Sequence, residues 1–328
     1  MAYPVGISDF TRLQLELTSF CNAACPSCER AKYEVLPEQI YKKFLNSTEI
    51  SLDNIKKWLP LDKMTSLRNL HFCGNIDEPT LHSDLFGVCK YFEENTPDHV
   101  WIHISTNGGT RNKEFWEEMA SLKRTLIVFG IDGLEDTNHI YRKNVRWKKL
   151  QDNFRTYIKA GGDAAWQFIK FKHNLHQIEE CRKLSLDESF VSFNTVDSTR
   201  ENFEVEAVET QLKSDSCVRC KATYFNHELE KSFFIDVSGN VWPCCWMATK
   251  NVIEYQFVPI VGHKFGHFLS NNLKYEKFED IISGEMFSYL YDHQKDFDVC
   301  NQHCKENISD VFTWDIEEQW KNKRLAID

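Results

Sequence analysis

From residue 12 onward, short apolar runs alternate along the chain with longer segments that mix hydrophobic and polar positions. Short apolar runs rich in β-branched and aromatic residues predict strands, and the longer amphipathic stretches between them predict helices. The expected strands are residues 13–17, 70–73, 100–105, 125–131, 166–171 and 190–194. This alternation is typical of βα units with parallel strands, so we expect an α/β fold up to about residue 195.

The expected helices begin and end at residues that favour helix termini. Ser51 offers a side-chain cap to a helix over residues 51–59, and Pro60 cannot continue that helix. Residues 113–122 form a second amphipathic stretch. Residues 147–160 form a third, which ends at Gly161 and Gly162, where a left-handed cap is expected.

The alternation stops after about residue 200, where cysteines become dense. Residues 232–242 predict a β-hairpin that turns through Ser238, Gly239 and Asn240. We therefore divide the chain into two domains, residues 1–199 and residues 200–328. The sequence has no long Pro/Gly-rich linker between them, so we expect the two domains to pack together and to share a site.

The net charge and the distribution of apolar residues indicate which classes of partner and which cellular location to expect. The formal net charge of −10 argues against a nucleic-acid backbone as the main partner, because such proteins usually carry a basic face. The first residues lack the pattern of a signal peptide, and no apolar run approaches the roughly 20 residues of a membrane-spanning helix. We therefore expect a soluble cytoplasmic protein with no membrane partner.

The 12 cysteines are many for a cytosolic chain of this length. A reducing compartment disfavours a disulfide framework, so metal ligation is the leading explanation for cysteines that cluster. Most of them fall into three groups, and the other three are expected to be ordinary buried thiols. The groups are Cys21, Cys25 and Cys28; Cys217, Cys220, Cys244 and Cys245; and Cys300 and Cys304, with Cys73, Cys89 and Cys181 standing alone.

The first cysteine group has the spacing Cys-x3-Cys-x2-Cys and directly follows the first expected strand, as Cys21, Cys25 and Cys28. Such a loop can wrap three thiolates around one face of a 4Fe-4S cluster and leave the fourth iron open for a ligand. Unrelated thiols, or a zinc loop completed elsewhere, are the alternatives. The motif resembles that of the radical S-adenosylmethionine (SAM) superfamily, in which SAM chelates the open iron through its amino and carboxylate groups. The resemblance implies a partial (β/α)6 TIM-like barrel.

The segment after the second expected strand, HFCGNIDEPTL, resembles the superfamily's Gly-Gly-Glu-Pro motif. The resemblance implies that Gly74, Asn75 and Glu78 hold the SAM amino group, with Asp77 as an alternative acceptor. The paired glycines of the motif are not retained. Read without the resemblance, the segment is an ordinary loop between a strand and a helix.

The third expected strand ends in Ser105, Thr106 and Asn107, which resemble the superfamily's Ser/Thr-Asn-Gly edge beside the SAM ribose and carboxylate. The fourth ends in a segment similar to Ser-Ile-Asp-Gly, in which Asp132 is retained to accept from the ribose or to orient a substrate. Arg142 follows shortly after and is a candidate for a carboxylate or substrate contact.

Two polar residues interrupt the apolar fifth and sixth expected strands. They are Gln167 and Asn194. If they face inward, they point into the mouth of the barrel, where ligands bind in parallel βα folds. We therefore include both among the candidate cofactor-binding residues.

The later cysteines resemble the twitch domain or shortened SPASM domain that follows many radical SAM barrels. Gly239 precedes Cys244 in a Gly-x4-Cys element, with one cysteine upstream and a late pair downstream. The resemblance implies one auxiliary 4Fe-4S cluster, with Cys217 and Cys245 as substitutes if the register differs. The implied ligands are Cys220, Cys244, Cys300 and Cys304. Four thiolates can equally hold a structural zinc ion.

The resemblance also implies the reaction. A one-electron donor such as flavodoxin or ferredoxin reduces the first cluster, SAM is cleaved to methionine and a 5'-deoxyadenosyl radical, and that radical takes a hydrogen atom from the substrate. An auxiliary cluster could then accept an electron, which would make the net reaction an oxidation. We expect a peptide or protein substrate, and a radical SAM dehydrogenase of small sugar or cyclitol alcohols is the alternative. A noncatalytic iron–sulfur carrier or a zinc-dependent binding protein is the alternative of another class.

Overall fold

The computed structural model describes the barrel almost completely and parts of the C-terminal segment. The described residues are 5–26, 28–34, 48–73, 75–197, 206, 231–248, 271–293, 296–297 and 300. Gly74, Cys217, Cys220 and Cys304 lie outside these residues, and so does the expected domain boundary between residues 199 and 200. The assignments made for them from sequence stay predictions.

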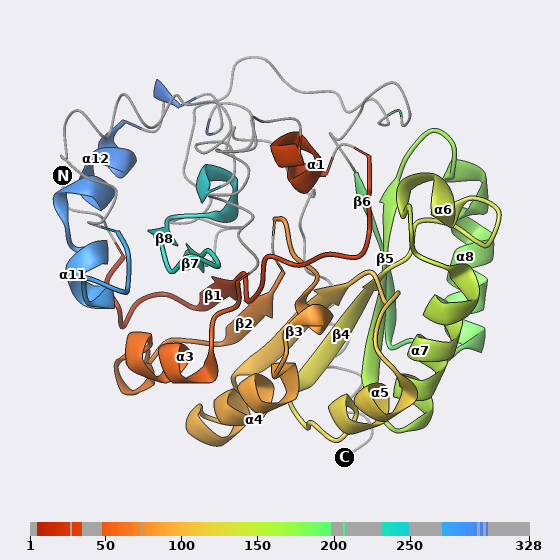
Figure 1. Cartoon of the computed structure of the whole chain (residues 1–328), viewed down its shortest axis with the longest axis horizontal. Coiled ribbons are helices and arrows are strands. Elements are labelled where there is room, and N and C mark those ends of the chain that lie inside the picture. Colours follow the sequence, from red (N-terminus) through yellow and green to blue (C-terminus); the bar gives the residue numbers. More distant parts are fainter. Residues whose placement is uncertain are drawn as a thin grey trace.

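The described strands form one sheet in the order β6-β5-β4-β3-β2-β1-β7-β8. All pairs are parallel except the last, which is antiparallel. The six expected strands are confirmed with ends shifted by a few residues, and the mostly parallel sheet agrees with a partial TIM-like barrel (Figure 1). The strands are β1 (Arg12–Leu15), β2 (Asn69–Phe72), β3 (Trp101–Thr106), β4 (Thr125–Gly130), β5 (Asp163–Lys170), β6 (Ser192–Asp197), β7 (Ser232–Ile235) and β8 (Val241–Trp242).

Helices cover the outer face of the curved sheet and alternate with its strands (Figure 1). The α-helices are α1 (Glu29–Glu34), α3 (Leu52–Trp58), α4 (Leu85–Asn95), α5 (Lys113–Met119), α6 (Asn138–Tyr141), α7 (Trp147–Lys159), α8 (Ile178–Asp187), α11 (Phe278–Ile282) and α12 (Glu285–Asp292). Short 3-10 turns lie at Leu61–Lys63, Pro79–Leu81 and Leu175–Gln177. The Ser51 side chain accepts from the Asn54 backbone at 3.2 Å, which confirms the expected cap of α3.

The two faces of the sheet carry different side chains, because successive residues of a strand point to opposite faces. In β4, Ile127 and Phe129 belong to the large core beneath the helices, whereas Leu126 and Val128 belong to a separate small cluster with Ala165. The same inner row continues through polar side chains, since Leu126 lies in register with His103 and then with His71 and Gln14. The interior of the barrel is therefore apolar at β4 and polar from β3 to β1.

The expected hairpin over residues 232–242 is confirmed as β7 and β8. Its turn is closed by the Asp236 carboxylate, which accepts from Ser238 N at 2.9 Å and Trp242 Nε1 at 2.9 Å, while Gly239 has a φ of +88°. Sequence reasoning did not find that β7 pairs in parallel with β1, from Arg12–Ser232 to Leu15–Ile235. The C-terminal segment therefore extends the barrel sheet directly.

The helices α11 and α12 pack against this hairpin through aromatic side chains. The Phe233 ring lies 5.5 Å from the Phe278 ring and 5.8 Å from the Phe287 ring, both nearly edge-on. Such aromatic pairs add to the burial of apolar surface and fix relative orientation. Within the described part of the chain, none of the helices combines the length and the apolar character needed to cross a membrane.

Candidate functional site

The loop with the first cysteine group begins at the carboxyl end of β1 and passes over the carboxyl ends of the neighbouring strands (Figure 1). Cys25 is buried, and Cys21 and Cys28 are partly buried. The loop is held to the barrel by two contacts, because Ala24 N donates to Lys143 O at 3.1 Å and Asn107 Nδ2 donates to Asn22 Oδ1 at 2.8 Å. The three cysteines thus lie at the edge where parallel βα folds bind ligands.

The Cys21 thiol lies in a buried environment beside the Glu78 carboxylate. Burial raises the pKa of Cys21 well above its ordinary value, the Glu78 carboxylate raises it further, and Cys25 and Cys28 add smaller contributions. Such a thiol ionises readily only when a metal compensates its charge. In the described residues, no set of His, Cys, Asp and Glu side chains is arranged around one metal ion. The cysteines of a cubane bind separate irons, so wider spacing is what a cluster requires.

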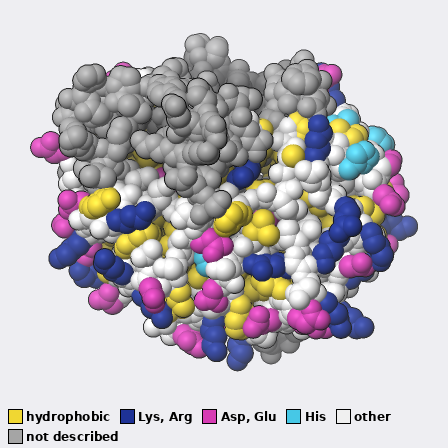
Figure 2. Space-filling model, in the orientation of Figure 1, with side chains coloured by type: hydrophobic (Ala, Val, Ile, Leu, Met, Phe, Trp, Pro, Cys, Tyr) yellow, Lys and Arg dark blue, Asp and Glu magenta, His cyan; other side chains and the backbone are white. Residues whose placement is uncertain are grey.

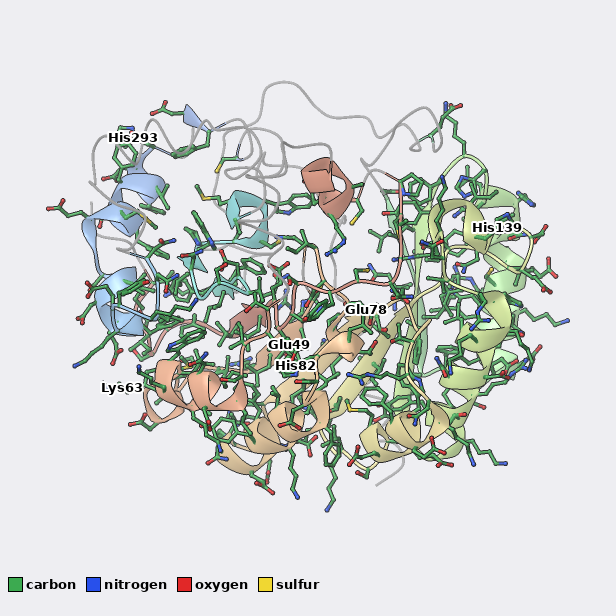
Figure 3. The ribbon with its side chains drawn as sticks, viewed as in Figure 1. Glu49, Lys63, Glu78, His82, His139 and His293 are labelled. Atoms are coloured by element: carbon green, nitrogen blue, oxygen red, sulfur yellow. The ribbon has the colours of Figure 1, made fainter. Side chains whose placement is uncertain are left out.

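Glu78 connects the cysteine loop to the ends of β2 and β3 (Figure 3). Its backbone N donates to Phe20 O at 2.7 Å, next to the first cysteine. Its buried carboxylate accepts from Thr80 Oγ1 at 2.7 Å, Thr106 Oγ1 at 2.5 Å and Asn107 N at 2.7 Å. Burial raises the pKa of Glu78, and these hydrogen bonds oppose that shift.

Asn75 connects the loop after β2 to the C-terminal segment. Its side chain Nδ2 donates to the backbone O of Cys245 at 2.9 Å, and the Cys28 thiol lies 3.9 Å from its carbonyl oxygen. We expected Asn75 to hold SAM, and in the structure its side-chain amide links the loop after β2 to Cys245 in the C-terminal segment. Asp77, the alternative acceptor, is partly buried two residues further along the same loop.

Glu16 is a site residue that sequence reasoning missed. It follows β1, is 4% exposed, and accepts from Asn75 N at 2.8 Å and Ile76 N at 3.0 Å. Burial and the nearby Asp236 carboxylate raise the pKa of Glu16 to about 7. A carboxylate at the end of an apolar strand was the signal that could have revealed it, because a buried carboxylate needs hydrogen-bond donors.

The end of β3 contributes the expected polar edge. Thr106 and Asn107 bind Glu78, as described above, and Ser105 Oγ lies 3.2 Å from His71 Nε2 in the barrel interior. The structure therefore brings Thr106 and Asn107 together with Glu78, and Asn107 also contacts Asn22 of the cysteine loop, whereas Ser105 points to the opposite face of the strand. Their contacts with SAM stay predictions.

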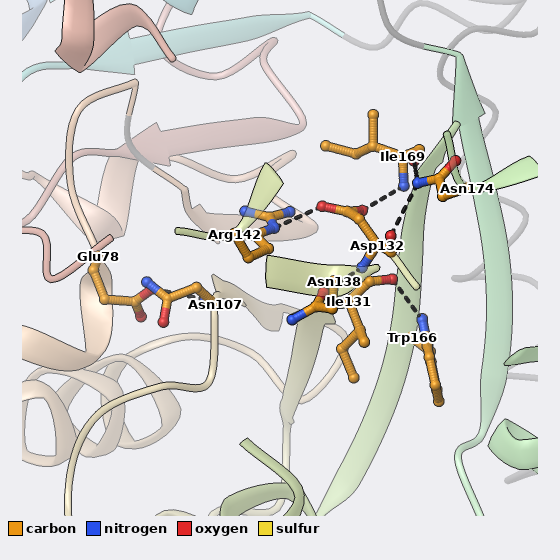
Figure 4. A network of polar contacts seen from close by, with 9 residues as sticks. All are labelled: Glu78, Asn107, Ile131, Asp132, Asn138, Arg142, Trp166, Ile169 and Asn174. Atoms are coloured by element: carbon orange, nitrogen blue, oxygen red, sulfur yellow. Dashed lines mark hydrogen bonds and ion pairs between the residues drawn. The ribbon is translucent and has the colours of Figure 1, made fainter. Parts of the chain in front are cut away.

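Asp132 and Arg142 form a buried ion pair after β4 (Figure 4). Arg142 Nε donates to Asp132 Oδ2 at 2.7 Å, and Ile169 N donates to Asp132 Oδ1 at 2.6 Å. Burial opposes the charge of Arg142, but Asp132 and Cys25 raise its pKa above the ordinary value. A Cβ at Gly130 would lie 2.4 Å from Arg142 Nη2, so the glycine in the motif's serine position makes room for the guanidinium.

Both carboxylate oxygens of Asp132 accept from protein donors, and one of these donors is Arg142. The expected contact of Asp132 with the ribose or the substrate stays a prediction. In the view of Figure 4, Arg142 lies between Asp132 and the pair of Glu78 and Asn107. An arginine placed in this way can bind a carboxylate.

Gln167 and Asn194 lie on the inner face of the sheet. They are paired in register on β5 and β6, and Gln167 is also in register with Gly130 of β4. The neighbouring Trp166 belongs to the outer core, so Gln167 points the opposite way, toward the interior of the barrel.

The later cysteines are described only in part. Cys300 is 5% exposed, and Cys244 and Cys245 are partly buried. Burial and then Cys73 raise the pKa of Cys245 to about 12, which places the Cys73 thiol nearby. Cys73 was expected to be an ordinary buried thiol, and this is wrong, because it directly follows β2 and is partly exposed beside Cys245. The same expectation is confirmed for Cys89 and Cys181, which are both buried.

Comparison with known proteins agrees with this geometry. A model of the radical SAM superfamily matches residues 15–187, and a model of the iron–sulfur cluster-binding SPASM domain matches residues 227–305. The SPASM match includes Cys244, Cys300 and Cys304 but not Cys217 or Cys220. Among curated proteins, the tungsten-containing aldehyde ferredoxin oxidoreductase cofactor-modifying protein of Pyrococcus furiosus is 26% identical over 132 residues. That match covers 39% of this chain and only 32% of the relative.

Two solved structures illustrate the fold. SuiB of Streptococcus suis, bound to precursor peptide SuiA, aligns with a TM-score of 0.56 and 15% identity over 88% of this chain and 67% of SuiB. BtrN, in complex with AdoMet and 2-DOIA, aligns with a TM-score of 0.52 and 14% identity over 92% of this chain and 95% of BtrN. At such identities the likeness shows the shared fold.

Proposed function

The chain belongs to the radical SAM superfamily and carries a C-terminal SPASM domain, and on that premise we propose that it modifies a peptide or protein substrate by abstracting a hydrogen atom. The main support for the proposal is that one site at the carboxyl ends of the strands includes residues of both the barrel and the C-terminal segment. There the cysteine loop, Glu78 and the C-terminal segment are linked by hydrogen bonds through Asn107 and Asn75. Radical SAM and SPASM domains imply SAM, one SAM-binding 4Fe-4S cluster and auxiliary iron–sulfur clusters.

We propose that Cys21, Cys25 and Cys28 hold the SAM-binding cluster. When bound, the cluster supplies the electron that cleaves SAM, and the protein groups around it bind and orient SAM. Glu78 offers a buried acceptor for the SAM amino group, and Arg142, oriented by Asp132, offers a donor for the carboxylate.

The remaining candidate residues would contact the rest of SAM or the substrate. Most of them lie on the loop after β2 or at the end of β3, and the other two lie within β5 and β6 on the inner face of the sheet. They are Gly74, Asn75, Asp77, Ser105, Thr106, Asn107, Gln167 and Asn194. Enclosing the reacting atoms among such side chains excludes water and competing hydrogen donors.

For the auxiliary cluster we keep Cys220, Cys244, Cys300 and Cys304 as ligands, with Cys217 and Cys245 as substitutes. The backbone of Cys245 is bound by Asn75, so the ligand next to it, Cys244, is held beside the SAM-binding half of the site. A fully ligated auxiliary cluster suits electron acceptance from the substrate radical, which would make the net reaction an oxidation.

The peptide substrate is supported by SuiB, which shares the fold and binds a precursor peptide. A small-molecule alcohol is the second candidate, supported by BtrN, whose whole length matches this chain more evenly. The electron donor would be a flavodoxin or ferredoxin.

The proposal is tested with anaerobically reconstituted protein, SAM and dithionite. We expect 5'-deoxyadenosine to form, and a short peptide encoded beside the gene to lose mass equal to one hydrogen molecule or to gain a cross-link. Product formed only from a sugar or cyclitol alcohol would favour the second candidate. Loaded protein that forms no 5'-deoxyadenosine would contradict both.

A further inference from the structure

A strongly basic segment stands out in this acidic chain. Residues 142–149 read RKNVRWKK, with five cations and no anion, in a protein of formal net charge −10. The Arg142 guanidinium forms an ion pair with Asp132. Among the other cations, Arg146 and Lys148 are exposed, and Lys143 and Lys149 are partly exposed. In Figure 2, Lys and Arg side chains lie on the right-hand side of the molecule, where α6 and α7 lie in Figure 1, and others lie on its left-hand and lower sides.

This basic segment runs along the outer side of the cysteine loop. Tyr141, just before it, packs against the buried Cys25, and Lys143 O accepts from the backbone of the exposed Ala24 at 3.1 Å. Further along, a Cβ built on Gly109 would lie 3.1 Å from both Val145 Cγ1 and Asn22 Nδ2, so these residues converge. The basic segment therefore begins against the cysteine loop, at Lys143 and Val145, and its exposed cations follow directly in the chain.

Local ion pairing accounts for only part of the positive charge, because Lys148 Nζ pairs with Asp152 Oδ1 at 2.6 Å one turn further along α7. The segment enters α7, where Arg146 is the N-cap without a side-chain cap bond, and the first turn holds Lys148 and Lys149 but no acidic residue. Cations at a helix N-terminus oppose the helix dipole, where Asp or Glu would be favourable. Among the described residues, Arg146 and Lys149 have no ion pair that offsets this cost, and a local rule broken in this way commonly marks a functional surface.

The surface continues away from the loop into a hollow between α5 and α7. Lys113, Lys149, Arg155 and Lys159 line this hollow together with Glu117 and Asp152. The Lys113 side chain is 68% exposed. Lys113 pairs with Glu117 at 3.2 Å and Arg155 pairs with Glu188 at 2.5 Å, so the cations of this hollow that add to the basic segment are Lys149 and Lys159. The basic surface therefore extends from the segment along α7.

We propose that residues 143–149 are the docking surface for a small acidic one-electron carrier protein of the flavodoxin or ferredoxin class. This inference rests on the proposed function, because the carrier would serve the cluster held by Cys21, Cys25 and Cys28. One electron leaves the reduced flavin or iron–sulfur centre of the carrier, which is thereby oxidised, and enters the cluster, and no bond or proton is exchanged.

Charge complementarity supports this partner. The negative chain as a whole repels an acidic carrier, so a local positive field steers the encounter to the segment over the cluster. Electron transfer between proteins weakens steeply with distance, so a productive complex must form there. Steering of this kind acts mainly on association and is screened by salt.

The test is the double charge reversal Arg146→Glu with Lys149→Glu, in reconstituted protein. The matched control is Lys57→Glu with Lys90→Glu, which makes the same charge change at exposed positions on α3 and α4. The reversal places acidic residues at the start of α7, which the helix dipole favours, so unfolding should not limit the variant. Initial rates of 5'-deoxyadenosine formation are measured with an enzymatically reduced flavodoxin and, separately, with dithionite. Binding of oxidised flavodoxin is measured by calorimetry.

We expect the reversal to raise the Kd and the apparent KM for flavodoxin by about tenfold or more at low ionic strength. The effect should shrink near 0.5 M salt, where the screening length falls to a few ångströms (about 3 Å at 1 M). Dithionite-driven rates should equal those of wild type. If the reversal and the control bind flavodoxin equally well, the docking surface is wrong. If the dithionite-driven rate falls in parallel, these residues act inside the site and the docking proposal is also overturned. A wild-type protein inactive with dithionite would instead count against the proposed function.

Discussion

Replacing Glu78 by glutamine tests how the site holds its ligand. The buried carboxylate accepts through Oε1 from Thr80 N, Thr80 Oγ1 and Thr106 Oγ1, and through Oε2 from Asn107 N. Glutamine keeps the shape but replaces one accepting oxygen with a donating NH2 group. The amide is best placed with its oxygen at the Oε1 position, which leaves the NH2 group facing Asn107 N.

The expected magnitude follows from these contacts. One hydrogen bond is lost and two buried donors face each other, which costs about 1–3 kcal/mol in the free energy of unfolding. If the Glu78 carboxylate accepts from the SAM amino group, the lost hydrogen bond to a charged acceptor is worth about 1.5–3 kcal/mol. That range corresponds to a roughly 10- to 150-fold higher Kd for SAM.

The assay is equilibrium binding of SAM to anaerobically reconstituted protein, with iron content and urea unfolding measured in parallel. Glu49→Gln is the matched control, because Glu49 accepts from Ser83 N at 2.9 Å and Ser83 Oγ at 2.6 Å, outside the network of Glu78. The control should bind SAM like wild type. Unchanged SAM affinity in Glu78→Gln, at unchanged iron content, would refute the assignment of Glu78 to the SAM amino group.

Three further predictions concern the wider network. Burial and Asp236 raise the pKa of Glu16 from 4.5 to about 7, so the folded protein holds a proton that the unfolded chain releases between these values. The free energy of unfolding should fall as pH rises through that window, by up to about 3 kcal/mol, and urea titrations of Glu16→Gln should lack this slope. Asp132→Asn leaves the buried Arg142 without its charge partner and should cost about 3–5 kcal/mol of unfolding free energy, with weaker SAM binding in the same protein. Metal analysis should find roughly eight irons per chain, falling to about four when Cys300 and Cys304 are both changed to Ala; four irons with one zinc in the wild type would make the C-terminal site structural.

Much of the barrel could be predicted because its signals are local. Each expected strand is a compact apolar run, and the caps at Ser51 and Gly161 depend on neighbouring residues only. The three cysteines of the first loop and the hairpin at Gly239 were likewise visible as short patterns. Here the tertiary contacts agree with these local preferences, so the elements form where the local patterns predict them.

The rest depends on contacts between segments distant in sequence. The pairing of β1 with β7 joins residues more than 200 positions apart, and no local pattern specifies it. The role of Glu16 depends on the same junction, where it meets Asn75 and Asp236. Cys73 was expected to be an ordinary buried thiol because no neighbouring residue indicates another role. Only the folding of distant segments brings it near Cys245.

The central claim is that the loop of Cys21, Cys25 and Cys28 carries out reductive SAM cleavage. The most direct measurement is 5'-deoxyadenosine formed per chain, by mass spectrometry, after anaerobic reconstitution and reduction with dithionite. We predict product from wild type and none from Cys21→Ala, Cys25→Ala or Cys28→Ala, each of which should remain folded and retain the auxiliary iron. Continued 5'-deoxyadenosine formation in any of these variants, or its absence in fully loaded wild type, would contradict the claim.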